Sequence, residues 1–592
     1  FDRSEDIALF DNFFTLGRPQ HYHQTLNGTY KIPIDKLPFL NFIRADYAYT
    51  ADFDWQASSQ SYIEQVGNSI QNSNTHNVSV DLDFNRFYKN IGLTKLLSKK
   101  KKSTSNKNQP TTNAPKAKNK KEKNSFAKTA LGILMSIKKA RISYQDNNGI
   151  FLPGYVPKVG FLGRDNYSGG LAPSLGFVFG SQIDIQQTAL ENGWLISRNI
   201  NDPGGADDEA YYNRTYAKTH FDKFNAAIDL RPIKGLDIEV SANKIYTKSI
   251  SQQLDVVNDL TLNETRFQDN LTSEYGNFSM SFNMIKTAFG SDADATFQEF
   301  KANRVEVSKR IAAQNGVDIT NTNPDGTVVG FGPNSQQVML PAFVAAYSGN
   351  SASSVNTNAF RDIPFPNWSM TYKGLMNNKW FKKTFQSFTL SHGYRSSYSI
   401  NNFSNNLLFS ESTKFIDTDL SGNFYNEKLL SNVNVIEEFS PLMKIDLKMK
   451  NSLSLKAELR KDRALNLNFN NNTLTEIRGK EYIVGVGYRI KDLKVRYKFD
   501  GKNQTIKGDL NLRADVKLRD DKTIIRDVDE DNDQVTGGQR LFSLTFKADY
   551  TLSRNLTASF YYDQNSSRYA VSTSFPRSSF STGLMIIYNL GN

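Results

Sequence analysis

Two histidines near the start of the chain have the spacing of a metal-binding pair. His21 and His23 stand two residues apart, so on a strand both imidazoles would project from the same face. No third ligand follows nearby in the sequence. A solvated pair of histidines is therefore the favoured interpretation.

A run of alternating acids near the C-terminus has the charge of a calcium loop. It consists of Asp527, Asp529, Asp531 and Asp533. An EF-hand has glycine at its sixth position and glutamate at its twelfth. Here Asn532 takes the glycine position and no glutamate stands at the twelfth. These residues are weak metal candidates, and a solvated loop is the favoured interpretation.

No other residue pattern indicates chemistry. The sequence contains no phosphate-binding loop, no nucleophile elbow and no metalloprotease helix. It contains no cysteine, which excludes disulfides and thiolate metal sites. We therefore expect a protein that is not an enzyme and that uses no cofactor.

The positive charge of the chain is concentrated in one segment. The net charge is +12, but eleven lysines and one acid between Lys99 and Lys128 supply +10 of it. Residues 98–125 are of low complexity, which predicts a disordered Lys-rich loop. A solvated loop is favoured over contact with anionic lipid or nucleic acid. Since the remaining surface is nearly neutral, we expect no nucleic-acid partner.

Alternation of apolar and polar residues dominates the rest of the chain, most clearly in a meander over residues 441–592. Its strands place apolar residues on one face and charged residues on the other. Aromatic residues close both ends of the apolar stretch, as with Phe542 and Tyr550. Eight steps of ~3.3 Å give ~26 Å, or ~20 Å at a ~40° tilt, close to the ~25 Å apolar band of outer-membrane barrels.

Strand length separates the two folds that fit this alternation. A secreted β-sandwich also alternates, but its strands are typically ~5–6 residues, whereas many here run to ~9 or more. We therefore predict an all-β protein, a large antiparallel transmembrane β-barrel with inserted loops and one or two short helices. Only 38% of the residues are hydrophobic, which such a barrel tolerates because its lumen is polar.

One region departs from the strand pattern. The period changes to that of a helix from Asp292 to Gln314, and residues 317–380 read as irregular. Residues 292–380 are thus predicted to be a helix plus an irregular capping insertion. We expect the long irregular segments to fold inward, into the lumen.

Several motifs resemble the SprA/Sov family, the giant outer-membrane translocon barrels of the type IX secretion system in Bacteroidetes. The resemblance rests on Leu152–Pro157, Gly160–Gly163, Leu175–Gln182, Pro341–Gly349, Ile363–Trp368, Asp11–Pro19 and parts of Glu481–Lys491. It covers most of the chain, and the Lys-rich tract is the part that does not match. The positions that carry it are Pro153, Gly154, Tyr155, Gly176, Phe177, Phe179, Pro341, Tyr347, Pro364, Pro366 and Trp368.

The resemblance implies a function that the periodicity does not. It implies that residues 1–592 are the C-terminal part of a wider single-chain barrel. That barrel would be integral to the outer membrane, would export folded cargo proteins from the periplasm to the cell surface and would be linked to gliding motility. The implied partners are secreted cargo, outer-membrane lipid, a small shuttle barrel at a lateral opening and a periplasmic plug protein. The alternatives are an outer-membrane nutrient receptor and, less favoured, a secreted β-sandwich adhesin.

Overall fold

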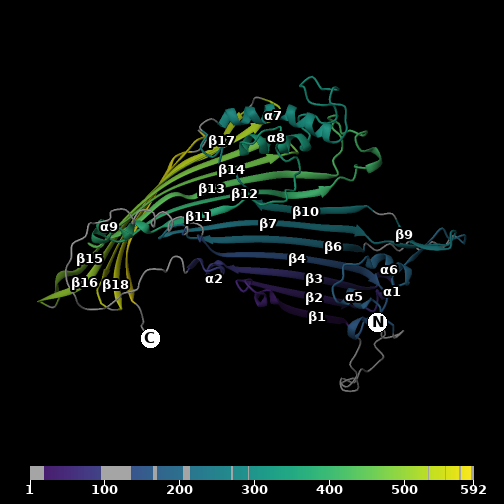
Figure 1. Ribbon diagram of the computed structural model, residues 1–592, viewed down its shortest axis with the longest axis horizontal. Helices are drawn as coiled ribbons and strands as arrows, with labels where there is room; N and C mark the ends of the chain where they lie inside the picture. Colours follow the sequence, from purple (N-terminus) through teal and green to yellow (C-terminus); the bar gives the residue numbers. More distant parts are fainter. Residues whose placement is uncertain are drawn as a thin grey trace, which may run out of the picture.

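The protein is a long curved sheet with helical insertions, as Figure 1 shows. The computed structural model describes residues 19–94, 132, 135–164, 170–204, 214–268, 271–290, 293–499, 501–530, 533–553, 555–571 and 575–588. The predicted disordered loop, residues 98–125, lies outside these residues.

The strands follow the chain in order, and most are far longer than those of ordinary soluble sheets. They are β1 (His21–Ile32), β2 (Ile43–Gln56), β3 (Asn68–Asp83), β4 (Ile137–Tyr155), β5 (Arg198–Ile200), β6 (Thr215–Leu230), β7 (Leu236–Gln253), β8 (Val256–Asp259), β9 (Glu264–Phe267), β10 (Thr272–Ser281), β11 (Asn367–Tyr372), β12 (Phe385–Asn405), β13 (Lys428–Met449), β14 (Leu453–Asn468), β15 (Thr473–Phe499), β16 (Lys502–Asp527), β17 (Asp533–Thr551), β18 (Leu556–Tyr569) and β19 (Arg577–Tyr588).

Helices occupy the connections. The α helices are α1 (Ile63–Val66), α2 (Phe84–Asn90), α5 (Leu175–Val178), α6 (Ile185–Glu191), α7 (Ala293–Gln314), α8 (Gln336–Ser348) and α9 (Lys379–Thr384), with short 3-10 turns at Pro33–Lys36, Phe161–Gly163, Gly374–Asn377 and Glu411–Thr413. No helix among the described residues is long and apolar enough to cross a membrane.

Sixteen strands form one antiparallel sheet that follows the order of the chain from β1 at one edge to β19 at the other, except that β11 pairs with β7 and β12. The longest strand, β15, has 27 residues. A separate small sheet pairs β5, β8 and β9. This confirms the predicted all-β class, with a large antiparallel wall, inserted loops and short helices. The closing meander begins earlier than residue 441, because β13 starts at Lys428.

One strand position in this sheet, between β7 and β12, is shared by two shorter strands, β10 and β11. β10 pairs with β7 from Gln252 to Lys244, and β11 pairs with the rest of β7 from Ser241 to Leu236. Both halves also pair with β12. Residues 282–366 leave the sheet between the two halves and then return to it. We call this insertion, which contains α7 and α8, the helical cap.

Two side chains close the hydrogen-bond ladder where the strand is broken. The Ser281 hydroxyl accepts from the Asn243 amide at 3.2 Å, and the Asn367 carbonyl oxygen accepts from the Ser396 amide at 2.7 Å. A buried backbone N–H group without a hydrogen-bond partner is costly. Ser281 and Asn367 therefore supply the acceptors that the Asn243 and Ser396 amides would lack where the chain leaves the sheet.

Each face of the sheet keeps its identity along whole strands. The pairing of β14 with β15 runs without a shift, so side chains alternate strictly between the two faces. One face carries Glu458 and its neighbours Lys456 and Arg460; we call it the polar face. The opposite face carries Leu455 and Leu459 and, further along, buried Leu465 and Leu467; we call it the cap face.

The cap face changes character along the strand. At one end it is an exposed apolar band, as with Val484 and Val486 of β15, which are 51% and 40% exposed. At the other end it is buried beneath inserted segments. Val433, Leu465 and Leu474 of the wall join α7 and α8 in one core cluster. A second insertion, residues 156–200 with α5 and α6, covers Phe53, Trp55, Ile70, Ile150 and Leu152 in the same way.

The prediction that residues 317–380 are irregular is therefore wrong for part of this segment. Residues 317–380 include the helix α8 and the strand β11. The helical cap also packs on the face that bears the apolar band, opposite the polar face. Strand parity decides this, because side chains that contact the cap and side chains of the band are an even number of residues apart.

Candidate functional site

The polar face carries a ladder of ion pairs across β14, β15 and β16. Glu481 is 2% exposed and accepts from Arg460 at 3.2 Å and from Lys517 at 2.7 Å. Arg519 bridges Asp462 at 3.2 Å and Asp521 at 2.9 Å. Most charges on this stretch are thus neutralised by a neighbour, which gives a hydrophilic surface of low net charge.

Glycines on β15 make room for this ladder. A Cβ atom on Gly479 would lie 2.4 Å from a carboxylate oxygen of Asp462, and one on Gly485 would lie 2.4 Å from Asp515. Real Cβ atoms do not approach oxygen so closely. A glycine at these positions lets the charged side chains lie flat along the sheet.

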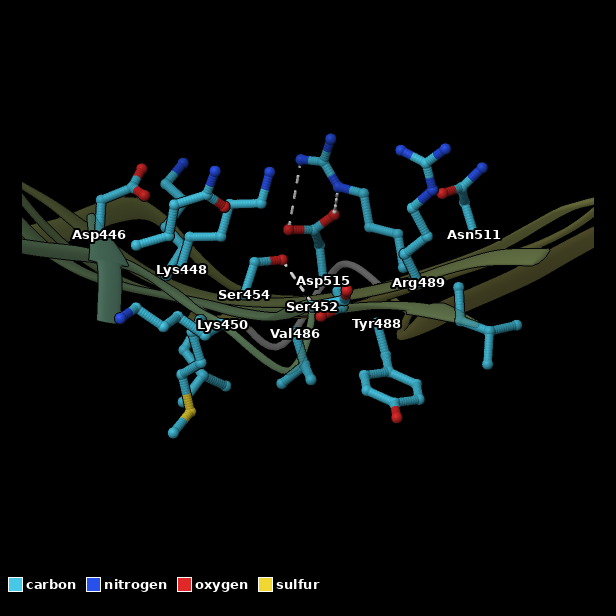
Figure 2. A pocket seen from close by; sticks show the side chains of 18 of the residues that line it. Asp446, Lys448, Lys450, Ser452, Ser454, Val486, Tyr488, Arg489, Asn511 and Asp515 are labelled. Atoms are coloured by element: carbon cyan, nitrogen blue, oxygen red, sulfur yellow. Dashed lines mark hydrogen bonds and ion pairs between the residues drawn. The ribbon is translucent and has the colours of Figure 1, made fainter. Parts of the chain in front are cut away.

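A recess of about 980 Å³ lies on the polar face between β13 and β16. Figure 2 shows Asp446, Lys448, Asp515 and Arg489 projecting to one side of the strands, and Val486 and Tyr488 to the other. The recess is shallow and its lining is charged, so it can hold water and polar chain segments rather than an apolar ligand.

The two predicted histidines lie on the polar face beside a carboxylate that the sequence did not reveal. His21 Nε2 and His23 Nδ1 both contact Asp54 Oδ1, at 2.8 and 2.9 Å. Asp54 lies on β2, directly opposite His23 in the register. The three residues form a hydrogen-bonded group, but not a convergent set of three ligand atoms.

The predicted acidic run does not converge either. Asp527 accepts the backbone amides of Asp529 and Glu530, which is turn chemistry. Asp533 pairs with Arg526. Asp531 lies outside the described residues. The described members therefore stabilise a turn and an ion pair.

One convergent group was missed from the sequence. Asp146 on β4 and His220 and Asp222 on β6 bring their ligand atoms within 4.8 Å of one another on the cap face. The register places Asp146 directly opposite Asp222. Tyr144 donates to Asp222 at 2.6 Å, and His220 contacts both Asp222 and Asn148. Only the cross-strand register brings these residues together, and a single sequence does not reveal it.

The first family-motif segment docks the second insertion onto the wall. Asn72 donates to the carbonyls of Phe177 and Ser181, both at 2.9 Å, and Asn74 donates to that of Gly180 at 2.7 Å. Gly180 has a φ of +87°, and a Cβ there would lie 3.0 Å from Ala51. The motif positions Gly176, Phe177 and Phe179 thus lie in or beside a tight turn against β2 and β3. Pro153, Gly154 and Tyr155 end β4 beneath it.

The second family-motif segment belongs to the helical cap. Pro341 and Tyr347 are buried in α8. Pro364 and Pro366 lie where the chain returns to the wall, and the Trp368 ring stacks on Tyr394 with centroids 4.5 Å apart. Of these motif positions, Tyr155, Phe177 and Tyr347 are buried in the core clusters that join the insertions to the wall, which indicates a structural role.

A layer of buried charges anchors the helical cap. Glu437 is 3% exposed and accepts from Arg463 at 3.0 Å and from the Tyr394 hydroxyl at 2.9 Å. Arg463 also donates to the Thr287 hydroxyl of the cap at 3.0 Å. Arg526, fully buried, pairs with Asp294 of α7 at 2.6 Å and with Glu476 at 3.4 Å.

Two tyrosines near this layer should respond differently to loss of their hydroxyl groups. The Tyr347 hydroxyl is buried without a hydrogen-bond partner among the described residues, and burial raises the pKa of this phenol. Tyr347→Phe should therefore change the free energy of unfolding by less than about 1 kcal/mol. Tyr394→Phe should cost about 1.5–3 kcal/mol, because its hydroxyl bonds to a carboxylate. Urea titration in detergent micelles measures the free energy of unfolding of both variants. Equal losses would contradict the conclusion that only the Tyr394 hydroxyl makes a stabilising hydrogen bond.

Comparison with known proteins finds no family model and no curated protein that matches the chain. Solved structures with some similarity include the RagAB peptide importer in its open-open state (7% identity, 89% of this chain, 48% of that chain, TM-score 0.26). Another is the siderophore receptor PirA from Acinetobacter baumannii (8% identity, 97% of this chain, 72% of that chain, TM-score 0.23). A third is the ferric-catecholate import receptor Fiu from E. coli K12 (8% identity, 93% of this chain, 65% of that chain, TM-score 0.23). The chain spans about half the length of the importer. None of these three belongs to the SprA/Sov family, so that resemblance stays a prediction.

Proposed function

We propose that the chain builds part of the wall of a large transport barrel in the outer membrane. The apolar band of the cap face contacts lipid, and the polar face lines an aqueous lumen. The observation that carries this is the strict division of the two faces. Band residues of β15 that are exposed and apolar, such as Tyr482 and Tyr488, alternate with polar-face residues such as Glu481 and Gly487.

The dimensions of the band support this placement. From Tyr482 to Ile490 the band spans eight residue steps, or ~26 Å along the strand and ~20 Å after a ~40° tilt, near the ~25 Å that a barrel presents to lipid. Tyrosines at 482 and 488 occupy the positions where interfacial aromatics are expected. The inserted helices lie beyond the band, where a strand would emerge from the membrane.

The finer proposal is a protein-conducting translocon of the type IX secretion system. The motif resemblance supports it, and so does the position of both insertions, which leave the described polar face uncovered. A passage for folded cargo needs such a wide, hydrophilic and nearly neutral wall. Secreted cargo, a plug protein and a shuttle barrel would then be its partners.

The second candidate is an outer-membrane importer. The similar structures include a peptide importer, a siderophore receptor and a ferric-catecholate import receptor. Both candidates need further strands, because β1 and β19 are not paired with each other in the described sheet. Deleting the gene discriminates between them: a translocon mutant strands cargo in the periplasm, whereas an importer mutant secretes normally and loses uptake of its nutrient.

The absence of cysteine makes the membrane placement directly testable. Asn511→Cys on the polar face should react with a charged maleimide when the protein is in lipid vesicles. Val486→Cys, on the opposite side of the same wall (Figure 2), should react only after detergent is added. The reverse pattern would show that the assignment of the two faces is wrong.

A further inference from the structure

A row of basic side chains crosses five neighbouring strands on the cap face, directly beside the apolar band. The register aligns, from β14 to β18, Lys461, Lys480, Asp520, Arg540 and Arg568. Two residues along each of β14 to β17, toward the band, the next row of the cap face consists of apolar residues. They are Leu459, Tyr482, Leu518 and Phe542. The row therefore begins where the apolar band ends.

A second basic row lies on the other side of the first. It aligns Arg463, Arg478 and Lys522 on β14, β15 and β16. Together the two rows hold seven cations and one acid, Asp520. We call this set the basic belt.

The belt is not neutralised from within. Arg463 and Arg478 have buried glutamate partners, and Arg540 pairs with Asp520 at 3.0 Å. Lys480, Lys522 and Arg568 are exposed and have no carboxylate partner among the described residues. This contrasts with the ladder on the polar face, where lysines and arginines of the same strands are paired.

Like charges also face one another across the strands. Arg478 lies between Arg463 and Lys522, and Arg540 lies opposite Arg568. Like charges directly opposite one another in a sheet destabilise it. A bound anion relieves this repulsion, whereas water alone only screens it.

The surroundings of the belt limit the kind of anion that fits. The Lys480 ammonium lies 5.2 Å from the centroid of the Tyr482 ring, at the edge of the apolar band. On the opposite side, the Lys461 ammonium donates to the Ala288 carbonyl at 2.6 Å and lies over the Phe289 ring of the helical cap. An occupant of this strip has its charge at the belt and its apolar part against the band.

We propose that the basic belt binds the phosphate groups of anionic membrane lipids, with their acyl chains along the apolar band. Basic side chains at the membrane surface attract anionic headgroups by about 1 kcal/mol each. The proposal rests on the proposed function in one respect, the placement of the band in lipid. The lipid phosphates would hold the wall at a fixed depth, with the helical cap above the headgroups.

The test compares a belt variant with a variant altered on the opposite face. The full chain is reconstituted in phosphatidylcholine vesicles that contain either phosphatidylglycerol or a bisphosphorylated lipid A, and the lipids that it retains are counted by native mass spectrometry. Lys480→Gln combined with Lys522→Gln should weaken retention of both anionic lipids about thirtyfold. Lys448→Gln combined with Lys491→Gln removes the same charge from the recess on the polar face and should leave retention unchanged.

Each other outcome is decisive. Unchanged retention in the belt variant overturns the inference while leaving the membrane wall intact. Equal loss in both double variants makes the effect one of net charge and overturns it as well. If inorganic phosphate displaces the lipids completely, the belt is a site for free phosphate. If the wild-type chain does not enter vesicles, the proposed function itself fails.

Discussion

Replacing Val484 with arginine should destabilise the membrane-inserted wall by about 2–4 kcal/mol, the cost of a cation on the lipid face of a barrel near the middle of the bilayer. Val484 lies inside the apolar band, and its side chain is 51% exposed with no polar neighbour in its cross-strand row. In a soluble sheet, an exposed valine would accept arginine at almost no cost.

The neighbouring residue provides the control. Ile483 projects to the polar face, between Glu458 and Lys517 in the register. Ile483→Arg should change the free energy of unfolding by less than about 1 kcal/mol, because water and carboxylates surround it there. Urea titration of both variants in lipid vesicles measures the difference. If the two arginines cost the same, the wall does not have one lipid face.

Breaking the buried pair between Arg463 and Glu437 should release the helical cap. Arg463→Met leaves Glu437 charged and 3% exposed, with the Tyr394 hydroxyl as its remaining donor. Removing one partner of a buried ion pair costs about 3–5 kcal/mol. The hydrogen bond to Thr287 is lost as well, so α7, α8 and the chain around Thr287 should lose protection in hydrogen exchange.

Two further variants separate the charge effect from lost packing. Adding Glu437→Gln to Arg463→Met removes the orphaned charge and should recover at least half of the loss. Arg540→Met breaks an exposed pair with Asp520, whose side chains are 66% and 55% exposed, and should cost less than about 1 kcal/mol. If the double variant is no more stable than Arg463→Met, the loss of stability does not come from the unpaired charge of Glu437, and the prediction is wrong.

Alternation was sufficient to predict the wall from the sequence. The faces of β16 and β17 can be read directly, because Leu510 to Leu518 and Phe542 to Tyr550 alternate without interruption. The helix α7 was also predicted to within one residue, because a 3.6-residue period over 22 residues is distinctive.

The helical cap was harder to predict for two physical reasons. The helix α8 is buried on nearly every side, so it has no amphipathic period, and Pro341 lies inside it. The break between β10 and β11 leaves no local signal, since each half reads as an ordinary short strand. The face of the wall on which the cap lies depends on the residue at which the chain leaves β10. Only the pairing register of β10 and β11 with β7 shows which residue this is.

The candidate sites depend on cross-strand register even more strongly. His21 and His23 were visible as a pair, but Asp54 comes from another strand. The basic belt is not apparent in sequence order, because its members come from five strands and only the cross-strand register aligns them in two rows.

The broken strand has a consequence for the order in which the chain assembles. Elsewhere in the sheet each strand pairs with the sheet strand that precedes it in the sequence. β11 is the exception, because it pairs with β7 and not with β10, and residues 282–366 separate it from β10 in the sequence. If the strands join the sheet in order from the N-terminus, residues 236–241 of β7 remain an unpaired edge until the helical cap has folded and β11 has joined the sheet. Completion of the cap would thus act as a checkpoint, and its failure should stall assembly at β10 with the second half of the wall unplaced.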